Sequence, residues 1–220
     1  MSERILEKLR EAVWYFDEDE VKRLSEEAVK TGLDPVEVLE EGLAKALREV
    51  GNRFGNGEAF ITELIASAQV MEAGAEILNR EIVKRGVTRK SVGKILIGTV
   101  EGDIHSIGKN IVKTMLTAAG FEVIDLGADV KSEEIVKKVK ELKPDILGLS
   151  SLMTTTMVKQ KEVIDELKKA GLRENVKVIV GGAPVTEAWV KEIGADACGL
   201  DASSAVKKAL KLMEAADGRV

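Results

Sequence analysis

The sequence holds very few of the side chains that bind metal ions in proteins. Among 220 residues there is one cysteine, Cys198, and one histidine, His105. A single cysteine excludes an internal disulfide, and a single imidazole excludes the zinc and dinuclear sites that need several histidines. Chemistry at a metal held by protein side chains alone is therefore not expected. A metal that arrives inside a cofactor is compatible with the sequence, because it needs only one protein ligand.

Aromatic residues, excess charge and long apolar runs are also scarce. Aromatic residues make up 3% of the chain and the net charge is −5 with both signs mixed, which argues against a nucleic-acid-binding surface. No apolar run approaches the roughly 20 residues needed to cross a bilayer. The chain begins in a charged helical pattern without a signal peptide. We therefore expect a cytoplasmic protein with neither a membrane nor a nucleic-acid partner.

The first ninety residues have the apolar spacing that is typical of helices. Two apolar stripes lie before residue 30, a third runs over residues 38–50 after a helix start at Asp34-Pro35, and a fourth runs over residues 62–83. The glycine-rich segment 51–57 breaks the pattern, so we expect a loop there. Four amphipathic helices with short connections predict an all-α four-helix bundle.

The pattern changes after the polar segment 85–91, where we place a boundary between domains over residues 1–88 and 89–220. Strands are expected over residues 94–100, 121–126, 145–150, 176–180 and 197–199, with helices between them and after the last. Regular alternation of buried strands and helices predicts a parallel sheet with helices on both faces. Five such units suit a flavodoxin-like (Rossmann-like) α/β domain with the strand order 2-1-3-4-5.

Three unusual loops follow strands of this predicted sheet. In such a sheet, ligands bind beyond the carboxyl ends of the strands, where the order reverses between the first and third strands. The loop over residues 101–108 holds His105 two residues after Asp103, a spacing that can orient an imidazole as a metal ligand. The loop over residues 150–156 is rich in hydroxyls, and the loop over residues 181–184 begins with two glycines. Taken alone, these features are explained by a surface histidine, a helix N-cap and a turn, but their coincidence at one edge predicts a ligand site.

Other ligands common to this fold are disfavoured by particular residues. A phosphoacceptor receiver needs an aspartate at the end of the third strand, where this chain has Ser150 and Ser151. A flavodoxin needs a phosphate-binding hydroxyl loop after the first strand, where this chain has Gly-Asp-Ile-His. The glycine-rich dinucleotide and P-loop patterns do not occur in the sequence.

The three loops resemble the cobalamin-binding signature D-x-H-x-x-G…S-x-L…G-G. Its parts in this chain are Asp103-x-His105-x-x-Gly108, Ser150-x-Leu152 and Gly181-Gly182. The helical half resembles the cap of methionine synthase and of the corrinoid proteins of methyltransferase systems, because residues 51–64 are similar to the cap segment VGxxFxxGExFxPEL. One departure is Thr62, where the family usually carries proline. The resemblance covers about residues 5–215.

The resemblance implies that the chain binds cobalamin or a related corrinoid. His105 would replace the cofactor's own base as the lower axial ligand of cobalt, Asp103 would accept the other imidazole N–H, and Thr156 would continue this relay. The other residues of the first loop implied to contact the cofactor are Gly102, Ile104, Ser106 and Gly108. The channel for the displaced nucleotide tail would be lined by Ser150, Leu152, Thr154, Gly181, Gly182 and Ala202.

The same resemblance implies that the helical domain covers the reactive upper face of the cofactor. Phe54 and Ile61 match family positions that shield the methyl group, and Glu40 matches a polar contact to the corrin. The alternative is that Phe54 and Ile61 are core residues of the bundle. The glycines around Phe54 favour a position in a loop over one inside a helix.

The activity implied by the resemblance is that of a corrinoid shuttle in one-carbon metabolism. A substrate-specific methyltransferase would move a methyl group from a methylamine, methanol, betaine or aryl methyl ether to Co(I) cobalamin. A second methyltransferase would pass the group from methylcobalamin to a thiol or to a tetrahydropterin such as tetrahydrofolate. An ATP-dependent reactivating protein is a further implied partner. The sequence does not identify the methyl donor, because a separate partner selects it.

Two other kinds of cobalamin protein share this signature. A cobalamin-dependent sensor or regulator also combines a helical cap with this fold, but it normally adds a DNA-binding domain for which we expect no residues here. The small subunit of an adenosylcobalamin mutase usually lacks the four-helix cap, so residues 1–88 count against it. Bound adenosylcobalamin would favour either alternative, whereas methyl transfer to Co(I) would favour the shuttle.

Overall fold

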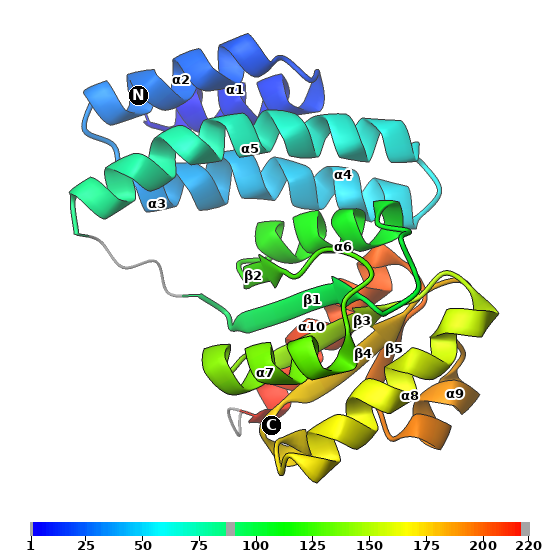
Figure 1. Cartoon of the computed structure of the whole chain (residues 1–220). Coiled ribbons are helices and arrows are strands. Elements are labelled where there is room, and N and C mark those ends of the chain that lie inside the picture. Colours follow the sequence, from blue (N-terminus) through cyan, green and yellow to red (C-terminus); the bar gives the residue numbers. More distant parts are fainter. Residues whose placement is uncertain (1, 87–90, 217–220) are drawn as a thin grey trace. The chain divides into compact units, whose positions relative to one another are not determined.

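The computed structural model describes residues 2–86 and 91–216, and the chain divides into two compact units, residues 1–90 and 91–220 (Figure 1). The boundary predicted between residues 88 and 89 lies outside the described residues. Among the helices of the described part, none combines the length and the apolar content needed to cross a membrane.

The first unit is the predicted helical bundle. Its elements are α1 (Ser2–Trp14), α2 (Glu18–Lys30), α3 (Pro35–Glu37), the π-helical segment η1 (Val38–Ala44), α4 (Lys45–Gly55) and α5 (Ile61–Lys84). The segments α3, η1 and α4 follow one another without a break and together form the third predicted helix. It begins as predicted, because the Asp34 side chain accepts a hydrogen bond from the Val36 N–H at 3.0 Å and Pro35 occupies the first turn.

The predicted end of this third helix is wrong, because α4 continues through Gly51 to Gly55. Glycine in a helix interior costs about 1 kcal/mol relative to alanine. The face of α4 that carries Leu47, Val50 and Gly51 is buried, and packing of that face outweighs the cost. Phe54 therefore lies in the last turn of a helix and not in a loop.

Helix α5 packs closely against its neighbours at a glycine in its middle. It begins at Ile61 without the family's proline, and the Phe60 N–H donates to Glu63 Oε2 at 2.6 Å. A methyl group at Gly74 would lie 2.6 Å from Val21 Cγ1 of α2 and 2.9 Å from Leu43 Cδ1 of η1. The missing side chain at Gly74 therefore sets how near α2 and η1 approach α5.

Substituting Gly74 tests this packing. Gly74→Ala gains about 1 kcal/mol of helix propensity but overpacks the core, which typically costs 1–3 kcal/mol or more against a stiff side chain such as Val21. We expect a net loss of about 1 kcal/mol in the free energy of unfolding, measured by chemical denaturation. The control is Glu72→Ala on the exposed face of the same helix, which should change stability by less than about 0.5 kcal/mol. A Gly74→Ala variant more stable than the parent would contradict the packing described here.

The second unit contains the predicted five-stranded parallel sheet. Its strands are β1 (Lys94–Thr99), β2 (Glu122–Asp125), β3 (Ile146–Ser150), β4 (Lys177–Gly181) and β5 (Ala197–Gly199). They lie in the order β2-β1-β3-β4-β5, all parallel, which confirms the predicted order 2-1-3-4-5. The connecting helices are α6 (Ile107–Ala118), α7 (Ser132–Leu142), α8 (Thr154–Lys169), the 3-10 turn η2 (Arg173–Asn175), α9 (Glu187–Ile193) and the last helix α10 (Ala202–Ala216).

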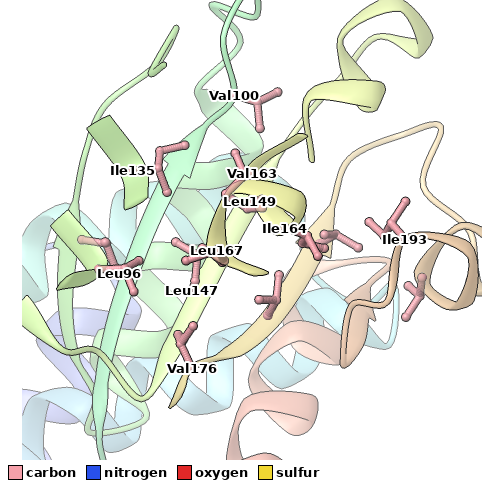
Figure 2. Packing of buried hydrophobic residues seen from close by; sticks show 14 of the residues in the cluster. Leu96, Val100, Ile135, Leu147, Leu149, Val163, Ile164, Leu167, Val176 and Ile193 are labelled. Carbon is pink, nitrogen blue, oxygen red and sulfur yellow. The ribbon is translucent and has the colours of Figure 1, made fainter. Parts of the chain in front are cut away.

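Successive side chains of a strand point to opposite faces of the sheet. Both faces therefore carry apolar side chains, and helices cover both. On one face, Leu96, Leu147 and Val178 pack with residues of α7, α8 and α9, and Figure 2 shows much of this cluster. On the other face, Ile95 and Ile146 pack with residues of α6 and α10. The carboxyl ends of β1, β3 and β4 carry the three loops singled out in the sequence.

Candidate functional site

The pairing of β1 with β3 brings two of these loops together. Thr99 at the end of β1 lies beside Ser150 at the end of β3, and the Val100 N–H donates to the Ser150 carbonyl at 3.1 Å. The loop between β1 and α6 therefore runs next to the loop between β3 and α8. Asp103 of the first loop is fully buried, whereas the His105 side chain is 47% exposed.

Asp103 accepts hydrogen bonds at both carboxylate oxygens. Oδ1 accepts from His105 Nδ1 at 2.8 Å and from the His105 backbone N–H at 3.0 Å. Oδ2 accepts from the Leu152 N–H at 2.7 Å and from Thr156 Oγ1 at 2.9 Å. Burial alone would raise the pKa of the Asp103 carboxyl, but these hydrogen bonds outweigh it and hold that pKa well below its usual range. The carboxylate is therefore ionised at neutral pH and can only accept protons in these bonds.

The ionised carboxylate determines which nitrogen of His105 is available. Because Asp103 cannot donate, the neutral form of the imidazole carries its proton on Nδ1 and an unshared electron pair on Nε2. The ring is held by the hydrogen bond at Nδ1, and the side chain as a whole is half exposed. This is the arrangement of a histidine that supplies one nitrogen to a metal while a second residue fixes its orientation.

The residues around His105 suit a metal that is carried by a large cofactor. Within residues 2–86 and 91–216, no three His, Cys, Asp or Glu side chains lie close enough together to hold a metal ion. Ile104 of the loop after β1 is 76% exposed, and Ile107 at the start of α6 and Leu152 of the loop after β3 are also exposed apolar side chains. A β-carbon at Gly108, in the first turn of α6, would meet nothing within 4 Å apart from its own neighbours in the helix. A single imidazole beside an apolar rim and open space fits a broad, largely apolar ligand that supplies the remaining metal ligands itself.

A residue that the sequence analysis missed holds the backbone of this loop. Asp129, between β2 and α7, accepts the Gly102 N–H at Oδ1 at 2.7 Å and donates its own N–H to the Asp103 carbonyl at 3.0 Å. Asp129 adopts a φ of +55°, a left-handed conformation that aspartate tolerates better than most residues. The sequence suggests only that Asp129 lies in a turn after Gly127. It does not indicate a contact with Gly102, 27 positions away.

The third loop approaches the second through its glycines. Gly182 has a φ of +128°, and a β-carbon there would lie 1.6 Å from the Ser151 carbonyl oxygen, so only glycine fits. The Gly181 carbonyl accepts the Ser151 N–H at 3.0 Å. The structure thus brings the loops after β1, β3 and β4 together, as the sequence predicts.

The other predicted site residues of this unit lie at the same edge of the sheet. Leu152 and Thr154 are exposed, Ser106 and Ser150 are half-buried, and Ala202 is buried at the start of α10. Thr156 is buried against Asp103, as a relay residue requires. Ser151, which follows the end of β3 where a receiver carries its aspartate, is also buried here.

Three predicted site residues belong to the helical unit. Glu40 lies in η1, half-buried, with its carboxylate 3.6 Å from the Arg48 guanidinium. Phe54 is half-buried in α4, and Ile61 at the start of α5 is 40% exposed.

Comparison with known proteins identifies the class to which this fold and site belong. Residues 93–210 match a family model described as a B12 binding domain, and residues 5–79 match a second model with the same description. Both units are therefore parts of a B12-binding protein, and the cofactor is cobalamin or a related corrinoid.

Individual relatives cover almost the whole chain. A trimethylamine corrinoid protein of Methanosarcina barkeri is 48% identical over 206 residues, 94% of this chain and 95% of that protein. A dimethylamine corrinoid protein of Methanosarcina acetivorans is 48% identical over 211 residues, 96% of this chain and 98% of that protein. The crystal structure of the methanol:cobalamin methyltransferase complex MtaBC from M. barkeri contains a similar chain, with a TM-score of 0.87, 31% identity, and coverage of 97% of this chain and 81% of that one. The chain belongs to the corrinoid protein family, which confirms the resemblance drawn from the three motifs.

The contribution of Asp129 can be measured on the protein without cofactor. Asp129→Ala removes the acceptor for the Gly102 N–H, worth about 1 kcal/mol, and forces alanine into the left-handed region, which costs about 1 kcal/mol more. We expect a loss of about 2 kcal/mol in the free energy of unfolding by chemical denaturation. Asp129→Asn keeps an acceptor and tolerates the same backbone, so it should lose less than about 0.5 kcal/mol. Equal stability of the two variants would show that Asp129 does not hold the loop.

Proposed function

We propose that the protein is a methyl carrier that binds its corrinoid with His105 as the lower axial ligand of cobalt and the cofactor's own base displaced. The observation that carries this proposal is the 2.8 Å hydrogen bond between Asp103 Oδ1 and His105 Nδ1, which leaves Nε2 as the accessible nitrogen. The similarity to corrinoid proteins named for trimethylamine and dimethylamine, and to a chain of a methanol:cobalamin methyltransferase complex, supports the methyl-carrier part.

The residues of the site would act by binding and orientation. When bound, the corrinoid supplies a cobalt that accepts a methyl group from one partner and releases it to another. His105 presents Nε2 as one axial nitrogen, and Asp103 keeps the proton on Nδ1 and the ring in one orientation. Thr156 donates to the second carboxylate oxygen and so moderates how strongly Asp103 draws on the Nδ1 proton. Exposed Ile104 and Leu152 offer apolar contacts and exclude water beside the ring.

The remaining site residues are assigned by their positions in the motifs. Gly102, Ile104, Ser106 and Gly108 would contact the cofactor next to His105. Ser150, Leu152, Thr154, Gly181, Gly182 and Ala202 would line the channel for the nucleotide tail. In the helical domain, Phe54 and Ile61 would shield the upper face and Glu40 would contact the corrin.

The partners would divide the reaction between them. A substrate-specific methyltransferase would supply the methyl group, and the similarity to a chain solved in a methyltransferase complex supports such a partner. A second methyltransferase would pass the group to a thiol or a tetrahydropterin, and an ATP-dependent protein would return oxidised corrinoid to the active state. Relatives named for two different methylamines are equally identical to this chain, which supports a small methylated amine or alcohol as the donor class that we propose.

Electron paramagnetic resonance of the Co(II) cofactor tests the axial ligand. Protein labelled with 15N and reconstituted with unlabelled cobalamin should show the doublet splitting of a 15N nucleus, and unlabelled protein should show the triplet of 14N. His105→Ala should lose the protein-derived splitting while the overall fold, followed by circular dichroism, is retained. A triplet that persists in the labelled protein would assign the ligand to the cofactor's own base and contradict the proposal.

Methyl transfer tests the carrier role separately. Protein loaded with Co(I) cobalamin is mixed with methyltransferases specific for trimethylamine, dimethylamine or methanol and with the matching donor. We expect conversion to the methylated cofactor spectrum with one of these pairs and no conversion when the donor is omitted. Preferential retention of adenosylcobalamin, with no methylation by any pair, would instead favour a sensor or a mutase subunit.

A further inference from the structure

Ser151 is a buried hydroxyl beside the His105 site that the recognised motifs do not include. It occupies the unspecified position between Ser150 and Leu152, and it is 0% exposed. Its Oγ lies 2.8 Å from Thr156 Oγ1, 3.2 Å from the Met153 carbonyl and 3.5 Å from Asp103 Oδ2. Ser151 thus adds a second hydroxyl to the group around the Asp103 carboxylate.

The number of protons determines the direction of these hydrogen bonds. Thr156 has one hydroxyl proton and three acceptors within reach, Ser151 Oγ at 2.8 Å, Asp103 Oδ2 at 2.9 Å and the Met153 carbonyl at 3.2 Å. Asp103 Oδ2 is the only ionised acceptor of the three and forms the strongest hydrogen bond, so Thr156 donates to Asp103. The oxygen of Thr156 is then an acceptor, and the closest donor to it is Ser151 Oγ. The hydroxyls therefore form a directed chain from Ser151 through Thr156 to Asp103.

We propose that Ser151 is a positioning residue that, through Thr156 and Asp103, sets how strongly the His105 imidazole donates electrons. A hydroxyl that accepts a hydrogen bond becomes a better donor, so Ser151 strengthens the bond from Thr156 to Asp103. That bond withdraws charge from the carboxylate and weakens its pull on the His105 Nδ1 proton. Loss of the Ser151 hydroxyl therefore makes the Asp103–His105 bond stronger and Nε2 more electron-rich. The effect on cobalt rests on the proposed role of His105 as axial ligand.

The backbone of Ser151 is held independently of its hydroxyl. Its N–H donates to the Gly181 carbonyl at 3.0 Å, and its carbonyl lies directly against Gly182. Ser151→Ala therefore removes one hydroxyl without releasing the loop, and the fold should be unchanged.

The first test uses the protein without cofactor. Because His105 is the only histidine, its imidazole 1H and 15N resonances are unambiguous in a labelled sample. At one fixed neutral pH, Ser151→Ala should move the Nδ1–H proton downfield of the parent, and Thr156→Ala should move it at least as far in the same direction. Thr156→Ser is the matched control and should leave the resonance at the parent position. An unchanged or upfield resonance in Ser151→Ala, together with a shift in Thr156→Ala, would overturn the proposal.

The second test uses the reconstituted protein. A more strongly donating imidazole stabilises Co(II) relative to Co(I), so Ser151→Ala should have a more negative Co(II)/Co(I) midpoint potential than the parent, with Thr156→Ser unchanged. A potential equal to that of the parent would overturn the effect on cobalt. The two tests separate this inference from the proposed function, because the resonance shift in the apo protein is expected whether or not His105 binds cobalt.

Discussion

The buried carboxylate of Asp103 is the group on which the geometry of the site depends. An ionised oxygen pair without exposure to water is stable only when donors surround it, and here they come from His105, Leu152 and Thr156. These donors belong to the loop after β1, the loop after β3 and the first turn of α8. Satisfying one carboxylate therefore fixes the relative position of the two loops, the orientation of the imidazole and the identity of its free nitrogen together.

The parallel sheet makes this convergence possible, and its loops contribute in different ways. The β1 and β3 ends lie side by side, so Asp103 reaches Leu152 across a separation of 49 residues in sequence. The loop after β2 supports the backbone around Asp103 through Asp129, and the loop after β4 presses Gly182 against Ser151. Under the proposed ligation by His105, one histidine would be sufficient, because the corrin would supply the other nitrogen ligands. The scarcity of histidine therefore argues against metal sites that need several imidazoles and is compatible with a metal carried by a cofactor.

Much of this arrangement could be predicted from the sequence because it depends on local pattern. The strand–helix alternation gave the sheet order, and the two-residue spacing of Asp103 and His105 anticipated their hydrogen bond. Contacts that depend on how the loops pack against one another could not be predicted in this way. Neither Asp129 nor Ser151 has a sequence pattern that identifies its partner. The helix through Gly51 was also missed, because burial of one face of α4 overrides the low helix propensity of glycine.

A crystal structure of the corrinoid-loaded protein tests the central claim most directly, because it locates both imidazole nitrogens. The account predicts Nε2 of His105 bound to cobalt on the lower face, the cofactor's own base away from the metal, and Nδ1 still within hydrogen-bonding distance of Asp103. Coordination through Nδ1, or a lower face occupied by the cofactor's base with His105 turned away, would contradict it.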